Sequence, residues 1–177
     1  MKTNKNIFLL AIITVLLTAC QAEAPVEPPQ SQEEVLALMT RLAPLLNPLL
    51  TPDIYGGTYI DDENQLIILV TEESEALREA LNEYLNEGEY VEIRLVDHSI
   101  KEMTEAIEVL NEIVRERLET FEADDESFNF YMQIASGIDV SSNRVDIWVI
   151  DFSEENIPLY RERLIDFPFV KFRERGE

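Results

Sequence analysis

The apolar residues of this chain change their spacing several times, and each change predicts a different element. Ser31 and Glu34 can form a capping box, after which apolar side chains recur every three or four residues, as on one helix face: Val35, Leu38, Met39, Leu42 and Leu45. Pro44 and Pro48 lack an amide donor and clash with the preceding turn, so we expect the helix to end at them. Its apolar stripe can pack within the domain or bind a partner, and packing is the commoner role.

A shorter period follows, which predicts strands. Residues 58–61 and 66–70 flank a polar turn in which Asn64 can adopt a positive φ, so the segment predicts a β-hairpin. Ser74 can cap the helix that comes next. Over 91–95 apolar residues alternate with charged ones, as in a half-buried strand. The predicted order is ββαβ.

The same order recurs 78 to 79 residues later in the chain. A strand over 145–150 follows a turn, and 128–135, which alternates apolar and polar residues, predicts the first strand of this second unit. A helix then starts at Ser153 or Asn156, and 169–173 supplies the closing strand. The repetition predicts two similar units.

A long helix is predicted between the two units. Ser99 and Glu102 can form a second capping box, and the apolar residues after it again recur every three or four positions: Met103, Ile107, Leu110, Val114, Leu118 and Phe121. We expect Ile107, Leu110 and Val114 to be buried on its inner face.

The expected fold class is α+β. Two ββαβ repeats, over about 55–97 and 128–173, are joined by the long helix over about 99–122, with an additional N-terminal helix. We expect one ectodomain over 31–177, because this length suits a single domain with enough apolar content to bury a core.

The N-terminal residues predict export. Lys2 and Lys5 precede an apolar run over 7–17, interrupted only by Thr14, which leads through Leu17-Thr18-Ala19 into Cys20, the only cysteine. The run is too short to span a bilayer stably. Its end resembles the lipobox of bacterial lipoproteins, which implies a signal peptide over 1–19, cleavage after Ala19 and a diacylglyceryl group on the sulfur of Cys20.

Lipidation at Cys20 implies a lipid anchor in the cell membrane or outer membrane, facing outside the cytoplasm. Two acyl chains suffice for lasting attachment without a spanning helix. Residues 21–30 contain three prolines and predict an extended tether, which together with Cys20 separates the anchor from the ectodomain. At about 3.1 Å per residue the tether reaches roughly 30 Å.

The charge balance excludes nucleic acid as a partner. The chain has 14 basic and 36 acidic residues, and loss of the two lysines of 1–19 leaves 12 basic residues and a net charge of −24. Nucleic-acid binding depends on Lys and Arg that replace counterions on phosphates. The acidity can serve solubility or form an acidic recognition surface, and solubility is the plainer interpretation.

No catalytic group is predicted, so we expect a protein that is not an enzyme. Asp97, His98 and Ser99 have the residue types of a hydrolase triad, but adjacent residues cannot align nucleophile, base and orienting group. Ser99 is better explained as a helix cap, and His98 as a surface or satisfied polar residue. No GxSxG elbow, HExxH helix or phosphate loop occurs.

No metal ligand or cofactor is predicted either. An EF-hand counted from Asp61 to Glu72 fails because Leu66 stands where the loop needs glycine. Weak coordination of calcium by Asp61 and Glu63, or by the acidic cluster 124–126, stays open beside the plainer interpretation as solvated turns.

The strand motifs resemble a known family. Residues 56–61 (GGTYID), 66–71 (LIILVT), 137–139 (GID) and 143–145 (NRV) resemble the repeated strands of alpha-lytic-protease-type pro-regions, over about Tyr55 to Phe172. Such pro-regions assist the folding of chymotrypsin-like serine proteases and then occupy the active-site cleft with their C-terminal segment. No protease sequence follows before the chain ends at Glu177.

By this resemblance the C-terminal segment from Phe169 to Glu177 is the part that contacts a partner. The candidate partner-binding residues are Phe169, Lys171, Arg173 and Arg175. Alternatively, the three basic residues balance nearby acids and leave a frayed tail, which is the plainer interpretation.

Two functions follow from these observations. The first is a lipid-anchored, non-catalytic protein of the cell envelope that binds another secreted or envelope protein. The alternative is an inhibitor or folding assistant that acts in trans on a secreted chymotrypsin-like serine protease.

Overall fold

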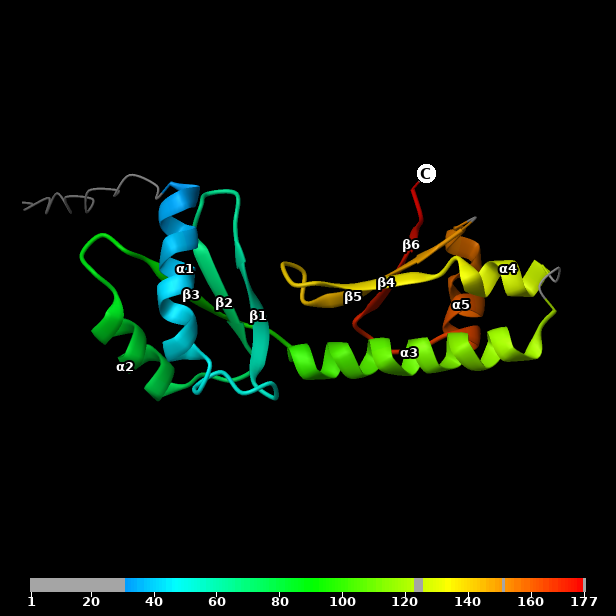
Figure 1. The fold of residues 1–177 in the computed structure, drawn as a ribbon, viewed down its shortest axis with the longest axis horizontal. Coiled ribbons are helices and arrows are strands. Elements are labelled where there is room, and N and C mark those ends of the chain that lie inside the picture. The colour runs from blue at the N-terminus through cyan, green and yellow to red at the C-terminus, as the bar shows by residue number, and fades with distance from the viewer. Residues whose placement is uncertain (1–30, 123–125, 151, 177) are drawn as a thin grey trace, which may run out of the picture.

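The computed structural model describes residues 31–122, 126–150 and 152–176. It contains two three-stranded mixed sheets and a long helix that joins the two units (Figure 1). The first unit consists of α1 (Gln32–Leu46), β1 (Tyr55–Ile60), β2 (Leu66–Val70), α2 (Glu75–Tyr84) and β3 (Val91–Leu95). The second consists of α3 (Ile100–Thr120), α4 (Glu126–Met132), β4 (Ala135–Asp139), β5 (Arg144–Val149), the short 3₁₀ helix η1 (Glu154–Asn156), α5 (Ile157–Arg163) and β6 (Val170–Glu174).

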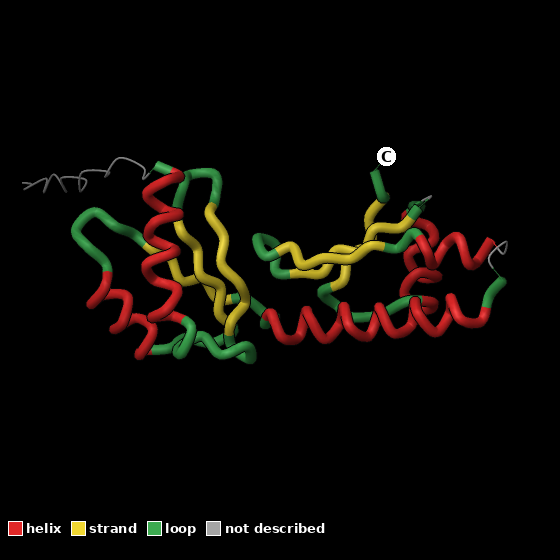
Figure 2. Tube along the Cα trace, in the orientation of Figure 1, coloured by secondary structure: helices red, strands yellow, loops and turns green. Residues whose placement is uncertain are grey.

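The two sheets have the same topology. β2 pairs antiparallel with β1 and parallel with β3, and β5 pairs antiparallel with β4 and parallel with β6. A helix makes the crossover to the parallel strand in each unit (Figure 2). Both hairpin turns use an asparagine in the left-handed region, Asn64 at φ 58° and Asn143 at φ 48°. The predicted α+β class with two ββαβ repeats is confirmed.

Each unit has its own hydrophobic core. In the first, α1 and α2 pack on the face of β2 that carries Leu66, Ile68 and Val70. In the second, α3, α4 and α5 contribute to a cluster around Val145, Ile147 and Val149 of β5. These strand residues alternate because successive side chains point to opposite faces of a sheet.

Helix α3 begins as the sequence predicts. Ser99 accepts a hydrogen bond from the Glu102 amide, and the Glu102 carboxylate accepts one from the Ser99 amide, which completes a capping box. Leu110 is buried, while Ile107 and Val114 are half-buried and pack against the second core. Among the described residues, no helix is long and apolar enough to cross a membrane.

The prediction of a strand over 128–135 is wrong. Residues Glu126–Met132 form helix α4, and the first strand of the second unit begins only at Ala135. A strand would place the neighbours Phe130 and Tyr131 on opposite faces. In the helix, Tyr131 is buried and stacks on Phe121, and Phe130 contacts both Tyr131 and Tyr160. Packing of these rings on the core overrides the local alternation.

Helix α1 was predicted to end at Pro44 and Pro48, and it ends between these two prolines. The helix continues to Leu46, so that both Leu42 and Leu46 reach the first core. Pro44 lies in the last turn, where its missing amide removes a single helical hydrogen bond. The Asn47 amide still donates to the Ala43 carbonyl at 3.0 Å, and the helix is over before Pro48.

We expect Leu110→Ala to destabilise the second unit by about 2–4 kcal/mol, because a buried leucine is replaced by a cavity. Val109→Ala is the matched control, since Val109 is 43% exposed on the same helix. The free energy of unfolding is measured by urea denaturation. Equal effects of the two substitutions would contradict the placement of α3 on the core.

Candidate functional site

The two units meet at the turn of the second hairpin. The His98 amide donates to the Asn143 side-chain carbonyl at 2.9 Å, and the Asn143 side-chain amide donates to the His98 carbonyl at 2.6 Å. Val140 of the same turn lies against Gly57 of β1, where a Cβ atom would come within 2.4 Å of a Val140 methyl group. Gly57 has φ 120°, which also disfavours other residues. The turn is thus fitted to the first sheet.

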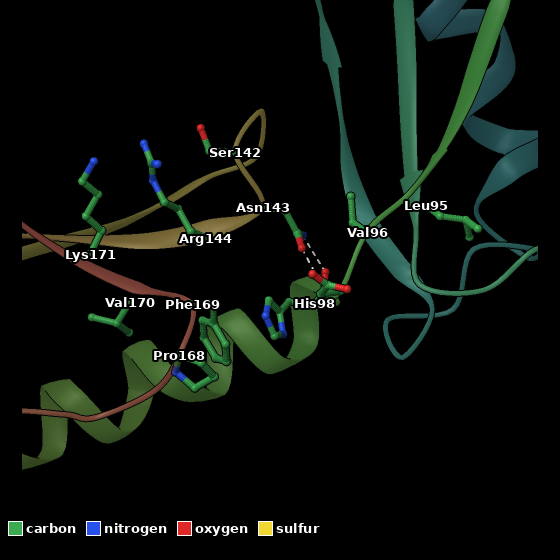
Figure 3. A pocket seen from close by; sticks show the side chains of 11 residues that line it. Leu95, Val96, His98, Ser142, Asn143, Arg144, Pro168, Phe169, Val170 and Lys171 are labelled. Carbon is green, nitrogen blue, oxygen red and sulfur yellow. Dashed lines mark hydrogen bonds between the residues drawn. The ribbon is translucent and has the colours of Figure 1, made fainter.

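A pocket of about 550 Å³ lies at this junction (Figure 3). Three segments line it: 95–98, which connects β3 to α3; 142–144, at the start of β5; and 168–171, at the start of β6. Two predicted partner-binding residues, Phe169 and Lys171, are among the lining residues. The structure therefore brings residues from both units to one hollow, which we call the junction pocket.

The junction pocket combines an aromatic wall with a basic rim. The His98 and Phe169 rings lie 4.4 Å apart between centroids, at an angle of 45°. Figure 3 shows the side chains of Arg144 and Lys171 pointing to the same side, away from Phe169. A ligand with both an apolar part and a negative charge suits this lining.

No hydrolase triad forms at the junction. Ser99 is only 1% exposed, and its hydroxyl is used in the capping box of α3. His98 is held through its backbone by Asn143, and its ring contacts Phe169. The interpretation of Ser99 as a helix cap is confirmed.

A cluster of four charged side chains lies on one face of the second sheet. Asp146 is only 4% exposed. Its carboxylate lies between two guanidinium groups: Arg144 Nε is 3.0 Å from Oδ1, and Arg173 Nε is 2.8 Å from Oδ2. The second contact is an ion pair without hydrogen-bond geometry. Asp139 joins the cluster at 2.9 Å from Arg144 Nη2. The two arginines thus offset the cost of burying Asp146.

The environment of Asp139 lowers its pKa below the ordinary value of 3.8. Burial acts in the opposite direction, but hydrogen bonds from Ser141 and Ser142 and the charge of Arg144 outweigh it. Asp139 therefore remains an anion that can pair with the arginines at neutral pH.

The basic residues of the C-terminal segment have different surroundings. Arg173 belongs to the charged cluster, and Arg175 donates to the Gln133 carbonyl at 2.7 Å, while its own amide donates to Val149. Lys171 is exposed at the rim of the junction pocket. Phe169 is half-buried beside His98. The chain is thus anchored to β5 as far as Arg175.

Trp148 is a half-buried residue that the sequence reasoning did not single out. It lies on the same face as Arg144 and Asp146, since it follows them at alternate positions of β5. Its ring reaches over Gly137 of β4, with ring carbons 3.4 and 3.5 Å from the position of a Cβ. The alternation of side chains along 144–149 was the sequence signal that could have placed Trp148 on the same face as Arg144 and Asp146.

The described residues contain no group of three or more His, Cys, Asp or Glu side chains arranged to hold a metal ion. Asp61 instead uses one carboxylate oxygen to accept the amides of Glu63 and Gln65, at 2.9 and 2.8 Å. This closes the hairpin turn. Of the other acidic cluster, residues 124 and 125 lie outside the described residues.

Two family models match the chain. One describes a Pro-like N-terminal domain and matches residues 14–93; the other describes a Pro-like C-terminal domain and matches residues 101–175. The gap between the matches, 94–100, runs from the end of β3 to the first residue of α3 and includes the pocket-lining residues 95–98. No curated protein matches the chain. Residues 14–93 and 101–175 are therefore similar to two Pro-like domains, which agrees with the resemblance of the strands to protease pro-regions.

We expect Arg173→Met to lower the free energy of unfolding by about 2 kcal/mol, because it leaves the buried Asp146 with one cation instead of two. Lys171→Met, two residues away on the same strand, should change stability by no more than about 0.5 kcal/mol because Lys171 is exposed. Urea denaturation of both variants measures the difference. A loss as small for Arg173 as for Lys171 would show that the cluster does not stabilise the sheet.

Proposed function

We propose that this chain is a non-catalytic, lipid-anchored protein of the cell envelope that binds another secreted or envelope protein. The observation that carries the proposal is the pair of Pro-like matches, which together span both ββαβ units. Pro-like domains are typically non-catalytic. The junction pocket supports a binding role, because both units contribute residues to it.

The site proposed for the partner is the C-terminal segment with the adjoining rim of the junction pocket. Phe169 and Lys171 line the pocket, and the segment lies at the edge of the second sheet as strand β6. An edge strand offers unpaired backbone groups to an extended segment of another protein. Arg173 and Arg175 support this edge from within the unit.

A second candidate is inhibition or assisted folding, in trans, of a secreted chymotrypsin-like serine protease. The Pro-like matches favour it, since protease pro-regions are the family that the strand motifs resemble. In this version the residues after β6 enter the protease cleft. The described chain extends two residues beyond Glu174, the last residue of β6.

The location of the protein is part of the proposal. Cys20 and the tether over 20–30 lie outside the described residues, as does the expected signal peptide over 1–19. The proposal places the ectodomain outside the cytoplasm, on a membrane that holds the lipid of Cys20.

We expect Cys20→Ser to release the protein from membranes or to leave it uncleaved, because no other cysteine can carry the lipid. Cell fractionation follows the protein, and mass spectrometry of the mature N-terminus identifies the modification. Ala22→Ser is the matched control, since it changes a small neighbour and keeps the thiol. An unmodified thiol at Cys20 in the mature wild-type protein would contradict the anchor.

We expect the mature chain, at micromolar concentration, to inhibit a chymotrypsin-like protease secreted by the same organism, or to speed its refolding. Deletion of Gly176 and Glu177 should weaken inhibition and leave stability unchanged, since the deletion spares the contacts of Arg173 and Arg175. A longer deletion would remove Arg173 and confound binding with folding. The control deletes 21–22 from the tether.

Residual peptidase activity and the yield of refolded protease are measured against the concentration of the chain. Absence of inhibition, of assisted refolding and of a complex by gel filtration would exclude the protease as partner. The envelope binding function would then require a different protein.

A further inference from the structure

The basic residues of the mature chain are unevenly distributed. Four of the 12 that remain after Lys5, namely Arg144, Lys171, Arg173 and Arg175, come from two neighbouring strands and the residue after them. The register of the second sheet places Asp146 opposite Lys171, and Trp148 opposite Arg173. Because residues opposite each other share a face, these side chains lie on the face that does not carry the core. We call it the outer face; in Figure 1, α3 runs along the other side of the sheet.

The carboxylates of the outer face are already used. Both oxygens of Asp146 face guanidinium groups, and Asp139 Oδ2 lies 2.9 Å from Arg144. Lys171 stands directly opposite Asp146 but has no carboxylate within 4.0 Å among the described residues. It therefore projects an uncompensated positive charge from a chain whose mature form carries −24.

An apolar surface adjoins this charge. The Trp148 ring extends over Gly137, where the absence of a side chain lets it approach the backbone of β4. The junction pocket, which Lys171 and Arg144 also line, is lined on its inner side by Pro168 and Phe169, and Phe169 packs against the second core. Trp148 is half-buried, and Trp is among the residues that most often dominate binding at protein interfaces.

We propose that the outer face binds an extended, acidic segment of a protein partner. Carboxylates of the segment pair with Lys171, the cation of this face that no carboxylate of the described residues neutralises, and its apolar side chains lie on Trp148 and in the junction pocket. Since the mature chain carries −24 overall, an acidic segment is disfavoured on most of the surface, which favours the position beside Lys171. The inference rests on the proposed function only in taking the partner to be a protein.

The test uses the chain from residue 20 to 177 with Cys20→Ser and three fluorescein-labelled peptides of equal length. The acidic probe is Gly-Glu-Glu-Phe-Glu-Glu-Gly, the neutral probe has Gln for each Glu, and the third has Lys for each Glu. Fluorescence anisotropy measures binding at low and high salt. We expect only the acidic probe to bind, and its affinity to fall as salt screens the ion pairs.

Lys171→Glu should weaken binding of the acidic probe at least tenfold, and Trp148→Ala should weaken it several-fold. Arg117→Glu makes the same change of charge at an exposed position on α3 and should leave binding nearly unchanged. Thermal melts verify that the variants remain folded. Lys171→Gln removes the positive charge without adding a negative one, so it should weaken binding by less than Lys171→Glu.

The outcomes separate this inference from the proposed function. Equal binding of the acidic and neutral probes, or equal effects of Lys171→Glu and Arg117→Glu, would overturn the inference. A protease that binds equally well to the wild-type chain and to Lys171→Glu would also overturn it, while the proposed function would stand. Binding of the acidic probe through Lys171 without any protease complex would support the inference and remove the protease as partner.

Discussion

The junction between the units depends on the side chain of Asn143. Its left-handed backbone makes the tight turn between β4 and β5, and the same residue forms two hydrogen bonds with the backbone of His98. These bonds hold the start of α3 against the hairpin, so the junction pocket has a fixed wall on each side. If the turn were closed by glycine, the backbone could adopt the same shape but the two hydrogen bonds would be lost.

How much the sequence predicts depends on how local the interactions are. Strand β2 and the capping boxes at Ser31 and Ser99 were predicted at the residues where they occur, since alternation and caps act within a few residues. Helix α4 was missed because the stacking of Tyr131 on Phe121 lies outside that range. The pairing of Asp146 with Arg173 depends on the register of β5 with β6, which spacing alone does not determine. Phe169 and Lys171 were selected by resemblance, and the hollow that they share with His98 requires the tertiary structure.

The net charge of the chain and the local charge of the outer face have opposite signs. Averaged over the chain, 36 acidic residues against 14 basic ones favour solubility and argue against nucleic acid as a partner. On the outer face of the second sheet, Arg144 and Arg173 neutralise Asp146 and Asp139. Lys171 is left as a positive charge without a paired carboxylate among the described residues. A partner close to the sheet experiences the local arrangement, because salt screens charges beyond about 8–10 Å. Net charge therefore predicts no binding of nucleic acid, but it does not exclude an acidic protein segment.

The two repeated units show how one local motif can take on separate roles. Asp61 and Asn64 close the first hairpin as Asp139 and Asn143 close the second, with the aspartate accepting backbone amides in both. In the first unit the aspartate oxygen serves only the turn, and the Asn64 side chain has no hydrogen-bond partner in another element within the described residues. In the second, Asn143 reaches the neighbouring unit and Asp139 pairs with arginine. The turn geometry is common to the two units, and the contacts beyond the turn make the second hairpin the one that forms the junction.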